Sequence, residues 1–493
     1  MSDRFQLRSR RIELAFTDLK PLYSRSEATS EAQRCLYCYD APCTKACPTR
    51  IDVPGFIKKI ATGNIKGSAR TILNSNVFGY SCARVCPVEV LCVGACVLSL
   101  EGKPPIAIGR LQRYATEPFV GTKVLMERRE NVGRSANKGK PSGRKIALVG
   151  AGPASIACAS YLTERGHKPV IFEKRDVPGG LNVSGIAPYK MHAHDSLKDT
   201  EWALSSGIEL RTGVEIGKDV SCGSLLEEYD AIFIGIGLGE DSLLGIPGER
   251  SRFEGKRGGD EVEDKRGGDE LEGKRGERVS AKRAVKQGEA ATRGPGIFSA
   301  IDMIEKIKLD STFNLDGVET VAVIGGGNTA IDAARELAHL GCRNVNILYR
   351  RTEAEMPGYA HELQAARAAG VHFIEKILPI RLLRVGDNPD GKLKGLIVAS
   401  AEKARPVPGT EREFAAQMLV VAIGQAGQAE FISGFPGVKS DSSGCVVVDE
   451  KTGRTGNTKV FAGGDCVNGG KEVVNAVAEG KRAAIAIDEM LKE

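Results

Sequence analysis

Long apolar stretches are missing from this sequence. No segment stays apolar for the ~18 residues that a membrane-spanning helix needs, so we expect no membrane anchor. The first residues, MSDRFQLRSRRIELAF, lack the apolar core of a secretory signal peptide. A strong charge of one sign is also missing, because 69 basic and 63 acidic residues leave a net charge of +6. We therefore expect a soluble, cytoplasmic protein that does not bind nucleic acid.

What the sequence has is length, apolar material and clustered cysteine. With 493 residues, 41% of them hydrophobic, it can build about three domains. Eight of its thirteen cysteines fall between Cys35 and Cys96. Disulfides are rare in long cytosolic chains, so this clustering indicates metal or redox chemistry.

The cysteine spacing favours iron–sulfur clusters. The first run is Cys-x2-Cys-x4-Cys-x3-Cys-Pro from Cys35 to Pro48, and the second is Cys-x3-Cys-Pro from Cys82, followed by Cys92 and Cys96. In two-cluster ferredoxins the cysteine before proline ligates the other cluster, and Cys47 and Cys86 both precede proline. The alternative is structural zinc, which prefers paired C-x2-C motifs, and only one such motif is present. The scattered Cys158, Cys222, Cys342, Cys445 and Cys466 are predicted to be small buried hydrophobic residues.

A first dinucleotide-binding motif follows a polar linker at 131–143. A strand at 146–149 leads into a glycine turn and a helix, and the second strand, 169–172, ends at a carboxylate suited to a ribose 2′-hydroxyl. The helix N-terminus would hold a pyrophosphate. The residues concerned are Gly150, Ala151, Gly152, Pro153, Ala154, Ser155 and Glu173.

A second motif of the same design begins at Gly325. Its turn consists of Gly325, Gly326, Gly327, Asn328 and Thr329, again between a strand and a helix. The next strand, 345–349, ends at Arg350 and Arg351, which suit the 2′-phosphate of NADPH, although a solvated arginine pair is the alternative. Near the C-terminus, a strand from Val460 ends in Gly463, Gly464 and Asp465, where a carboxylate could accept hydrogen bonds from flavin ribityl hydroxyls.

Between the two motifs lies a nine-residue repeat of mixed charge. GKRGGDEVE at 255–263 is followed by DKRGGDELE at 264–272. Such a segment cannot bury a core, so we interpret 251–295 as a disordered insertion, either a tolerated surface loop or a docking arm.

In this order the motifs resemble the electron-input modules of glutamate synthase (small subunit) and dihydropyrimidine dehydrogenase. CPTRIDVPGFI, SCARVCP, LCVGAC, GGLNVSGIAPYKM and FIGIGLGE are most similar to dihydropyrimidine dehydrogenase, both its N-terminal half and its separate bacterial PreT-type subunit. The resemblance covers nearly the whole chain except the insertion. It implies an α/β fold in which a helical two-cluster domain at 1–130 precedes two interleaved Rossmann-like domains. The FAD domain would comprise 144–250 and 430–493, and the NAD(P) domain 296–429.

The resemblance also implies a ligand set. One [4Fe–4S] cluster would use Cys35, Cys38, Cys43 and Cys96, and the other Cys47, Cys86, Cys92 and Gln112, while Cys82 would be no ligand. FAD contacts are implied at 151–155, Glu173, Gly180, Leu181, Lys190 and from Gly464 through Asp465 to Val473. NAD(P) contacts are implied at 326–329, Arg350, Arg351, Ala422, Ile423 and Gly424. The family does not decide between NADH and NADPH.

The implied activity is oxidation of NAD(P)H through FAD, with single electrons leaving through two clusters. A flavin is needed because nicotinamide gives two electrons as hydride, whereas a cluster accepts one at a time. The expected partner is an FMN-containing subunit that reduces uracil or thymine to the 5,6-dihydro base. The alternatives are the small subunit of NADPH-dependent glutamate synthase, another electron-transfer subunit of this kind, or a zinc-bound scaffold. No side chain is expected to act as a catalytic acid or base.

Overall fold

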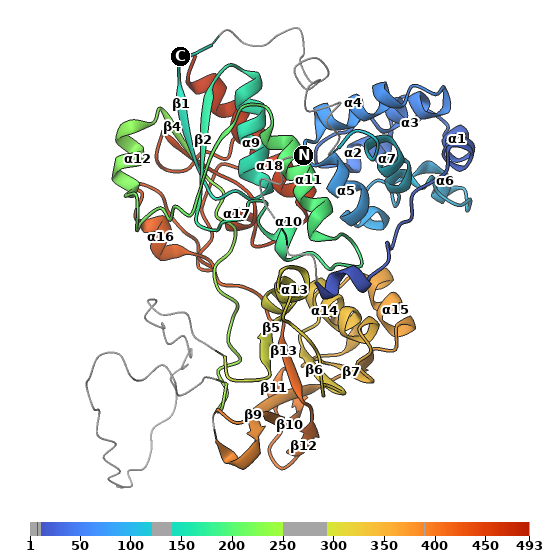
Figure 1. Cartoon of the computed structure of the whole chain (residues 1–493), viewed down its shortest axis with the longest axis vertical. Helices are drawn as coiled ribbons and strands as arrows, with labels where there is room; N and C mark the ends of the chain where they lie inside the picture. Colours follow the sequence, from blue (N-terminus) through green and yellow to red (C-terminus); the bar gives the residue numbers. More distant parts are fainter. Residues whose placement is uncertain (1–6, 8–10, 121–140, 250–292, 389, 493) are drawn as a thin grey trace.

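The computed structural model describes residues 7, 11–120, 141–249, 293–388 and 390–492. It confirms the expected α/β fold class, with a helical N-terminal part followed by two parallel sheets. Figure 1 shows the helical part beside the first sheet, with the second sheet below both. The nine-residue repeat, almost all of the expected insertion at 251–295 and most of the linker at 131–143 lie outside the described residues.

The N-terminal part, here called the helical unit, is a set of short helices. They are η1 (Ile12–Ala15), α1 (Arg25–Gln33), α2 (Pro42–Ala46), α3 (Val53–Ala61), α4 (Ile65–Ser75), α5 (Gly79–Val85), η2 (Val88–Val90), α6 (Val97–Leu100) and α7 (Ile108–Thr116). Helix α3 begins where Asp52 accepts a hydrogen bond from the Gly55 N–H at 3.0 Å. Its apolar face buries Val53, Phe56, Ile57 and Ile60 in the core of this unit.

The first sheet, which defines the first nucleotide unit, is parallel with the order β14-β4-β1-β2-β3. Its strands are β1 (Lys145–Val149), β2 (Lys168–Glu173), β3 (Glu209–Thr212), β4 (Ala231–Ile234) and β14 (Val460–Ala462). The helices are α9 (Pro153–Glu164), α10 (Leu181–Ser184), α11 (Ala193–Leu204), α12 (Cys222–Glu228), α16 (Ala429–Ser433), α17 (Asp465–Asn468) and α18 (Val473–Met490). The C-terminal segment therefore adds a strand to the first sheet rather than to the second.

The second sheet, which defines the second nucleotide unit, has the order β5-β13-β6-β7-β8 and is also parallel. Its strands are β5 (Ile297–Ser299), β6 (Thr320–Ile324), β7 (Asn344–Leu348), β8 (His372–Ile374) and β13 (Met418–Val421), with helices α13 (Ala300–Leu309), α14 (Asn328–His339), η4 (Glu353–Glu355) and α15 (Ala360–Ala368). The sequence did not predict a small antiparallel sheet at its far end, formed by β9 (Ile377–Arg384), β10 (Leu393–Glu402), β11 (Arg405–Pro406) and β12 (Arg412–Ala415), with η5 (Val385–Asp387) after β9.

Buried polar contacts join the helical unit to the first nucleotide unit. The Ser81 N–H on α5 donates to the Asp199 carboxylate on α11 at 2.8 Å, and the Tyr161 hydroxyl on α9 donates to the carbonyls of Asn74 and Ser75 at 3.1 and 2.9 Å. Phe78, just before α5, and Tyr80 of α5 lie in the same core as apolar side chains of α9 and β1. The cysteine region is therefore fixed against the first nucleotide unit.

Helix α18 packs against α9 at a glycine of α18. A Cβ at Gly480 of α18 would lie only 2.1 Å from the carbonyl oxygen of Ala154 and 3.1 Å from the Cys158 nitrogen on α9. Only glycine lets the two backbones approach this closely. The C-terminal helix is thus held directly against the start of α9.

The five cysteines outside the cluster region, at 158, 222, 342, 445 and 466, are all buried, as predicted. Among the described residues, no helix combines the length and the apolar character needed to cross a bilayer.

Replacing Gly480 with alanine tests this packing. We expect Gly480→Ala to lower the free energy of unfolding by about 1–3 kcal/mol, because the new methyl group meets backbone that cannot move aside. The matched control is Gly223→Ala in α12, where an added Cβ meets only Ser221 Oγ at 3.7 Å. That change should be neutral or stabilising by up to about 1 kcal/mol, since alanine is the better helix former. Equal thermal midpoints for the two variants would contradict the packing argument.

Candidate functional site

The first glycine turn is built around a buried carboxylate. Gly150 has φ +89°, and a Cβ there would lie 2.7 Å from the Gly235 carbonyl oxygen, so no other residue fits. The Ala151 N–H donates to Glu173 Oε2 at 2.7 Å and the Arg175 N–H to Oε1 at 2.9 Å. Glu173, at the end of β2, therefore holds the turn as well as lying where the sequence expects a ribose contact.

The other residues predicted for this nucleotide gather round the same turn. A Cβ at Gly180 would lie 3.1 Å from the Gly152 Cα, and one at Gly464 would lie 3.0 Å from the Ala154 Cβ. The Gly464 N–H donates to Glu479 Oε2 of α18 at 2.7 Å, and Val473 begins that helix. No described side chain caps the N-terminus of α9, so its first N–H groups are open to an anion.

The second glycine turn repeats this geometry in the second unit. Gly325 has φ +146°, and a Cβ there would lie 2.3 Å from the Ala422 carbonyl oxygen. The Gly326 carbonyl accepts a hydrogen bond from the Gly358 N–H at 3.1 Å. The N-terminus of α14, at Asn328, has no side-chain cap within the described chain. Both turns therefore present helix N-termini suited to a dinucleotide pyrophosphate.

Arg350 and Arg351 follow β7 and are both exposed at the edge of this turn. Arg351 lies near enough to Glu355 for its charge to help lower the pKa of that carboxyl. Both arginines line the space in front of this turn, where the sequence expects a 2′-phosphate.

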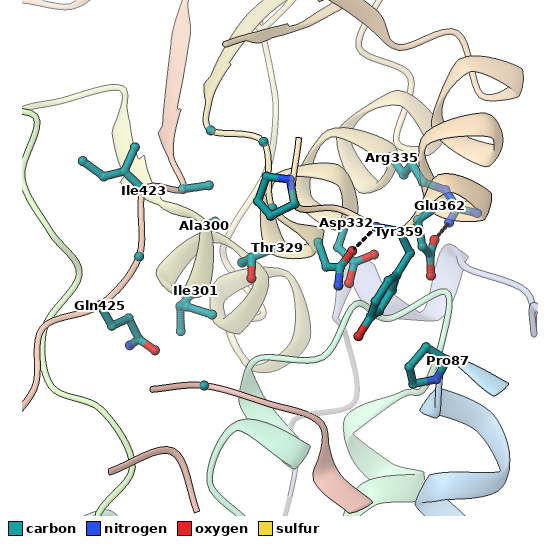
Figure 2. A pocket seen from close by; sticks show the side chains of 18 of the residues that line it. Pro87, Ala300, Ile301, Thr329, Asp332, Arg335, Tyr359, Glu362, Ile423 and Gln425 are labelled. Atoms are coloured by element: carbon teal, nitrogen blue, oxygen red, sulfur yellow. Dashed lines mark hydrogen bonds and ion pairs between the residues drawn. The ribbon is translucent and has the colours of Figure 1, made fainter. Parts of the chain in front are cut away.

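One large cavity, of about 1420 Å³, borders the second glycine turn and part of the first nucleotide unit, whereas the first glycine turn and Glu173 do not line it. Residues from all three units line it. The lining residues that the sequence analysis had singled out are Leu181, Lys190, Gly325, Gly326, Gly327, Asn328, Thr329, Arg350, Arg351, Ala422, Ile423, Gly424, Asp465 and Cys86. Figure 2 shows Thr329, Ile423 and Gln425 on one side of it and Tyr359 and Pro87 on the other. The second glycine turn, the first nucleotide unit and a cluster-region cysteine thus share one space.

Burial raises the pKa of two carboxyl groups that line this cavity. Burial raises the pKa of Asp465, and the Lys471 N–H, which donates to its Oδ1 at 3.2 Å, only partly opposes this. Burial also raises the pKa of Glu472, whose Oε1 accepts a hydrogen bond from the Tyr359 hydroxyl at 2.9 Å. Asp465 is therefore a half-buried acceptor just after β14, where it could receive a ligand hydroxyl.

Sequence reasoning missed several cavity residues. Asp332, Tyr359, Glu362 and Glu472 contact partners far away in the chain, and no spacing or motif distinguishes them. Lys190, expected from the resemblance to contact FAD, has its ammonium 2.8 Å from both Asp332 and Glu362.

The cysteines of the helical unit form two groups. The thiols of Cys35, Cys38, Cys43 and Cys96 line one small cavity, with apolar walls that include Ile57 and Ile108. Burial raises the pKa of Cys35, and it raises the pKa of Cys43 to about 11, with further contributions from the neighbouring thiols. The structure thus brings together the four cysteines that the resemblance assigns to one cluster.

The second group lies between the helical core and the first nucleotide unit. Cys47 and Cys86 pack against the core of the first unit, and Cys86 lines the large cavity. Burial raises the pKa of Cys92, with contributions from Cys86, Cys47 and Cys43, so these thiols are neighbours. Gln112 is buried on α7, and its Nε2 donates to the Gly79 carbonyl at 2.7 Å.

Cys82 differs from these residues. Its sulfur is buried and accepts a hydrogen bond from Asn76 Nδ2 at 3.3 Å. It also lies against the thiol of Cys86, whose pKa is raised by that contact and by burial. Within the described ranges no three Cys, His, Asp or Glu side chains converge closely enough for a single metal ion. Four thiols round one apolar cavity fit the ligand set of an iron–sulfur cluster.

Comparison with known proteins agrees with this geometry. Residues 11–124 match the family model described as dihydropyrimidine dehydrogenase domain II, 4Fe-4S cluster, and residues 144–480 match pyridine nucleotide-disulphide oxidoreductase. The chain belongs to the pyridine nucleotide-disulphide oxidoreductase family. It is therefore a flavin and iron–sulfur oxidoreductase.

Two curated relatives span nearly the whole chain. The glutamate synthase [NADPH] small chain of Escherichia coli (strain K12) is 31% identical, over 98% of this chain and 94% of its own length. The NAD-dependent dihydropyrimidine dehydrogenase subunit PreT of Salmonella typhimurium is 29% identical, over 97% of each chain. Both lie within the two groups that the motifs resemble.

Among solved structures, thioredoxin reductase of T. acidophilum has a similar fold. The TM-score is 0.50 at 19% identity, over 70% of this chain and 98% of that one. This likeness concerns the fold of the oxidoreductase family alone.

Serine substitutions test the cysteine groups in this oxidoreductase. Cys43→Ser should remove the iron and acid-labile sulfide held at its cavity, because a serine oxygen replaces one of four thiolate ligands. Cys82→Ser should keep all iron, since Cys82 is engaged by Asn76 instead. Iron and sulfide per protein, measured after anaerobic purification, give the answer. A whole cluster lost from Cys82→Ser would show that the ligand set is wrong.

Proposed function

We propose that this oxidoreductase takes hydride from NAD(P)H through FAD and passes single electrons through two [4Fe–4S] clusters to a partner subunit. The partner would carry FMN and reduce uracil or thymine to 5,6-dihydropyrimidines. The observation that carries the proposal is the large cavity, because the second glycine turn, Asp465 of the first unit and Cys86 all border it.

In this proposal each of the two glycine turns binds a different nucleotide. FAD is assigned to the turn at 150–155, where the buried Glu173 and the half-buried Asp465 would supply carboxylates for ribose and ribityl hydroxyls. NAD(P)H is assigned to the turn at 325–329. When bound, the flavin supplies the exchange between two-electron and one-electron chemistry. The chain itself would hold NAD(P)H at a cavity that Asp465 and Leu181 of the first unit also line.

The cysteine groups suggest the direction of electron flow. Of the proposed ligand set Cys47, Cys86, Cys92 and Gln112, Cys86 lines the cavity, so this cluster would receive electrons first. Cys92 is a neighbour of Cys43, which belongs to the set with Cys35, Cys38 and Cys96. That second set lies in the core of the helical unit and would pass electrons on to the partner.

The partner decides the final reaction. The PreT relative supports a pyrimidine-reducing partner, and the glutamate synthase relative, at similar identity, supports the large subunit of that enzyme as the alternative. Anaerobic co-purification followed by activity assays separates the two. Oxidation of NAD(P)H that depends on uracil or thymine supports the pyrimidine assignment. Oxidation that depends on glutamine plus 2-oxoglutarate would replace it with the glutamate synthase assignment.

The coenzyme preference is tested at the two exposed arginines. Hydrogen bonds between arginine and phosphate contribute roughly 1.5–3 kcal/mol each, or about tenfold to a hundredfold in affinity. Arg350→Ala combined with Arg351→Ala should therefore raise KM for NADPH far more than for NADH. Steady-state kinetics with a dye acceptor measures this without the partner subunit.

Arg343→Ala provides the control for this change. Arg343 is an exposed arginine before β7, at the strand end opposite to the glycine turn. Its replacement should leave both KM values unchanged. Equal losses with both coenzymes in the double variant, or a wild type that already favours NADH, would rule out the phosphate role.

A further inference from the structure

A buried ion-pair network joins the two nucleotide units beside the cavity. Lys190 belongs to the first unit, and its Nζ lies 2.8 Å from Asp332 Oδ1 on α14 and 2.8 Å from Glu362 Oε1 on α15. Glu362 Oε2 in turn accepts from Arg335 at 2.5 Å. All four side chains are between 6% and 14% exposed. Two cations and two carboxylates thus neutralise one another out of water, where each depends on its partners.

Tyr189, the residue before Lys190, adds two further contacts between the two nucleotide units. The Tyr189 hydroxyl donates to Asp332 Oδ1 at 2.5 Å, and its ring lies under the Arg335 guanidinium, 4.3 Å from ring centre to carbon. Two consecutive side chains of the first unit therefore enter the space between α14 and α15. A second junction, Tyr359 to Glu472 at 2.9 Å, crosses between the units nearby. Figure 2 shows Asp332, Tyr359 and Glu362 together on one side of the cavity.

The position of this network matters because the second glycine turn leads directly into α14. A shift of α14 relative to the first unit would move the nucleotide held at 325–329. Hydride transfer is very sensitive to such a shift, since a misplacement of about 1 Å can slow a reaction by about a hundredfold. Surface ion pairs could not fix this geometry, because solvent screens them.

We propose that Lys190, Asp332 and Glu362 form a clamp that positions the NAD(P)H-binding unit over the flavin. Glu362 is the member to test because it contacts neither glycine turn. The inference rests on the proposed division of the two nucleotides between the units. It assigns Glu362 a positioning role that neither nucleotide binding nor the clusters require.

The test compares two Glu→Gln variants in the same unit. Glu362→Gln breaks the buried clamp, whereas Glu305→Gln breaks the pair between Glu305 and Arg175, which also crosses between the units at 2.8 Å but is 32% and 52% exposed. In Glu362→Gln we expect flavin reduction by the preferred nucleotide to slow by about tenfold or more in anaerobic stopped-flow experiments. The nucleotide Kd, flavin content and iron content should stay unchanged. Glu305→Gln should match the wild type in every respect.

Hydrogen–deuterium exchange gives a readout that does not depend on turnover. Amides of α14, α15 and the segment around Lys190 should exchange about tenfold faster in Glu362→Gln than in the wild type or Glu305→Gln. If Glu362→Gln does not fold, Tyr359→Phe serves instead, because it removes only the hydroxyl that bonds Glu472. It should slow flavin reduction in the same way, without a change in Kd.

The outcomes separate the clamp from the function on which it rests. A wild type without flavin, or with flavin that NAD(P)H does not reduce, would overturn the proposed function. A wild type that is reduced, together with a Glu362→Gln variant of equal rate and equal exchange, would overturn the clamp alone. A parallel rise in Kd with the loss of rate would also overturn it, because Glu362 would then act on binding rather than on position.

Discussion

Two parallel sheets open the carboxyl ends of their strands onto one space, and the rest of the molecule depends on this constraint. Each sheet carries a glycine turn at that end, followed by a helix whose first N–H groups are free to hold a pyrophosphate. The second turn borders a cavity that Asp465, just after the last strand of the first sheet, also borders. The loop that carries Cys86 borders the same cavity. Parts of three units therefore meet at this cavity.

Burial changes the pKa of the cysteine thiols and of the ion-paired groups between the nucleotide units. Thiols such as Cys35, Cys43 and Cys92 lie in surroundings that raise the pKa, because burial disfavours the thiolate. Thiolates become favourable there only beside the positive charge of bound iron, so cluster binding is linked to the stability of the helical unit. The ion pairs between the nucleotide units follow the same physics. The carboxylates of Asp332 and Glu362, each 2.8 Å from its ammonium, raise the pKa of Lys190 against the opposing effect of burial.

The sequence predicted those features that depend on local backbone or on short spacing. Gly150 and Gly325 were recognisable because a tight turn at a strand end requires a positive φ, and both adopt one. The expected fold class was confirmed, whereas the domain boundaries and the residues assigned to each ligand stay predictions. The antiparallel sheet of β9–β12 was missed because its strands have no glycine motif. The contacts of Lys190 with α14 and α15 join residues far apart in the chain, so no periodicity could indicate them. The structure also shows that Glu173 supports the first turn itself, a second role that the strand-end motif does not reveal.

Anaerobic reduction by nucleotide, followed by absorbance and electron paramagnetic resonance on the same samples, tests the central claim most directly. The claim is that nucleotide, flavin and clusters form one line of electron transfer. It predicts that NADPH or NADH bleaches the flavin band first and that the signal of reduced [4Fe–4S] clusters then rises in the partner-free protein, once a low-potential mediator is present. A flavin that is fully reduced while the clusters respond only to dithionite would contradict it, because the cavity would then not connect the two kinds of centre.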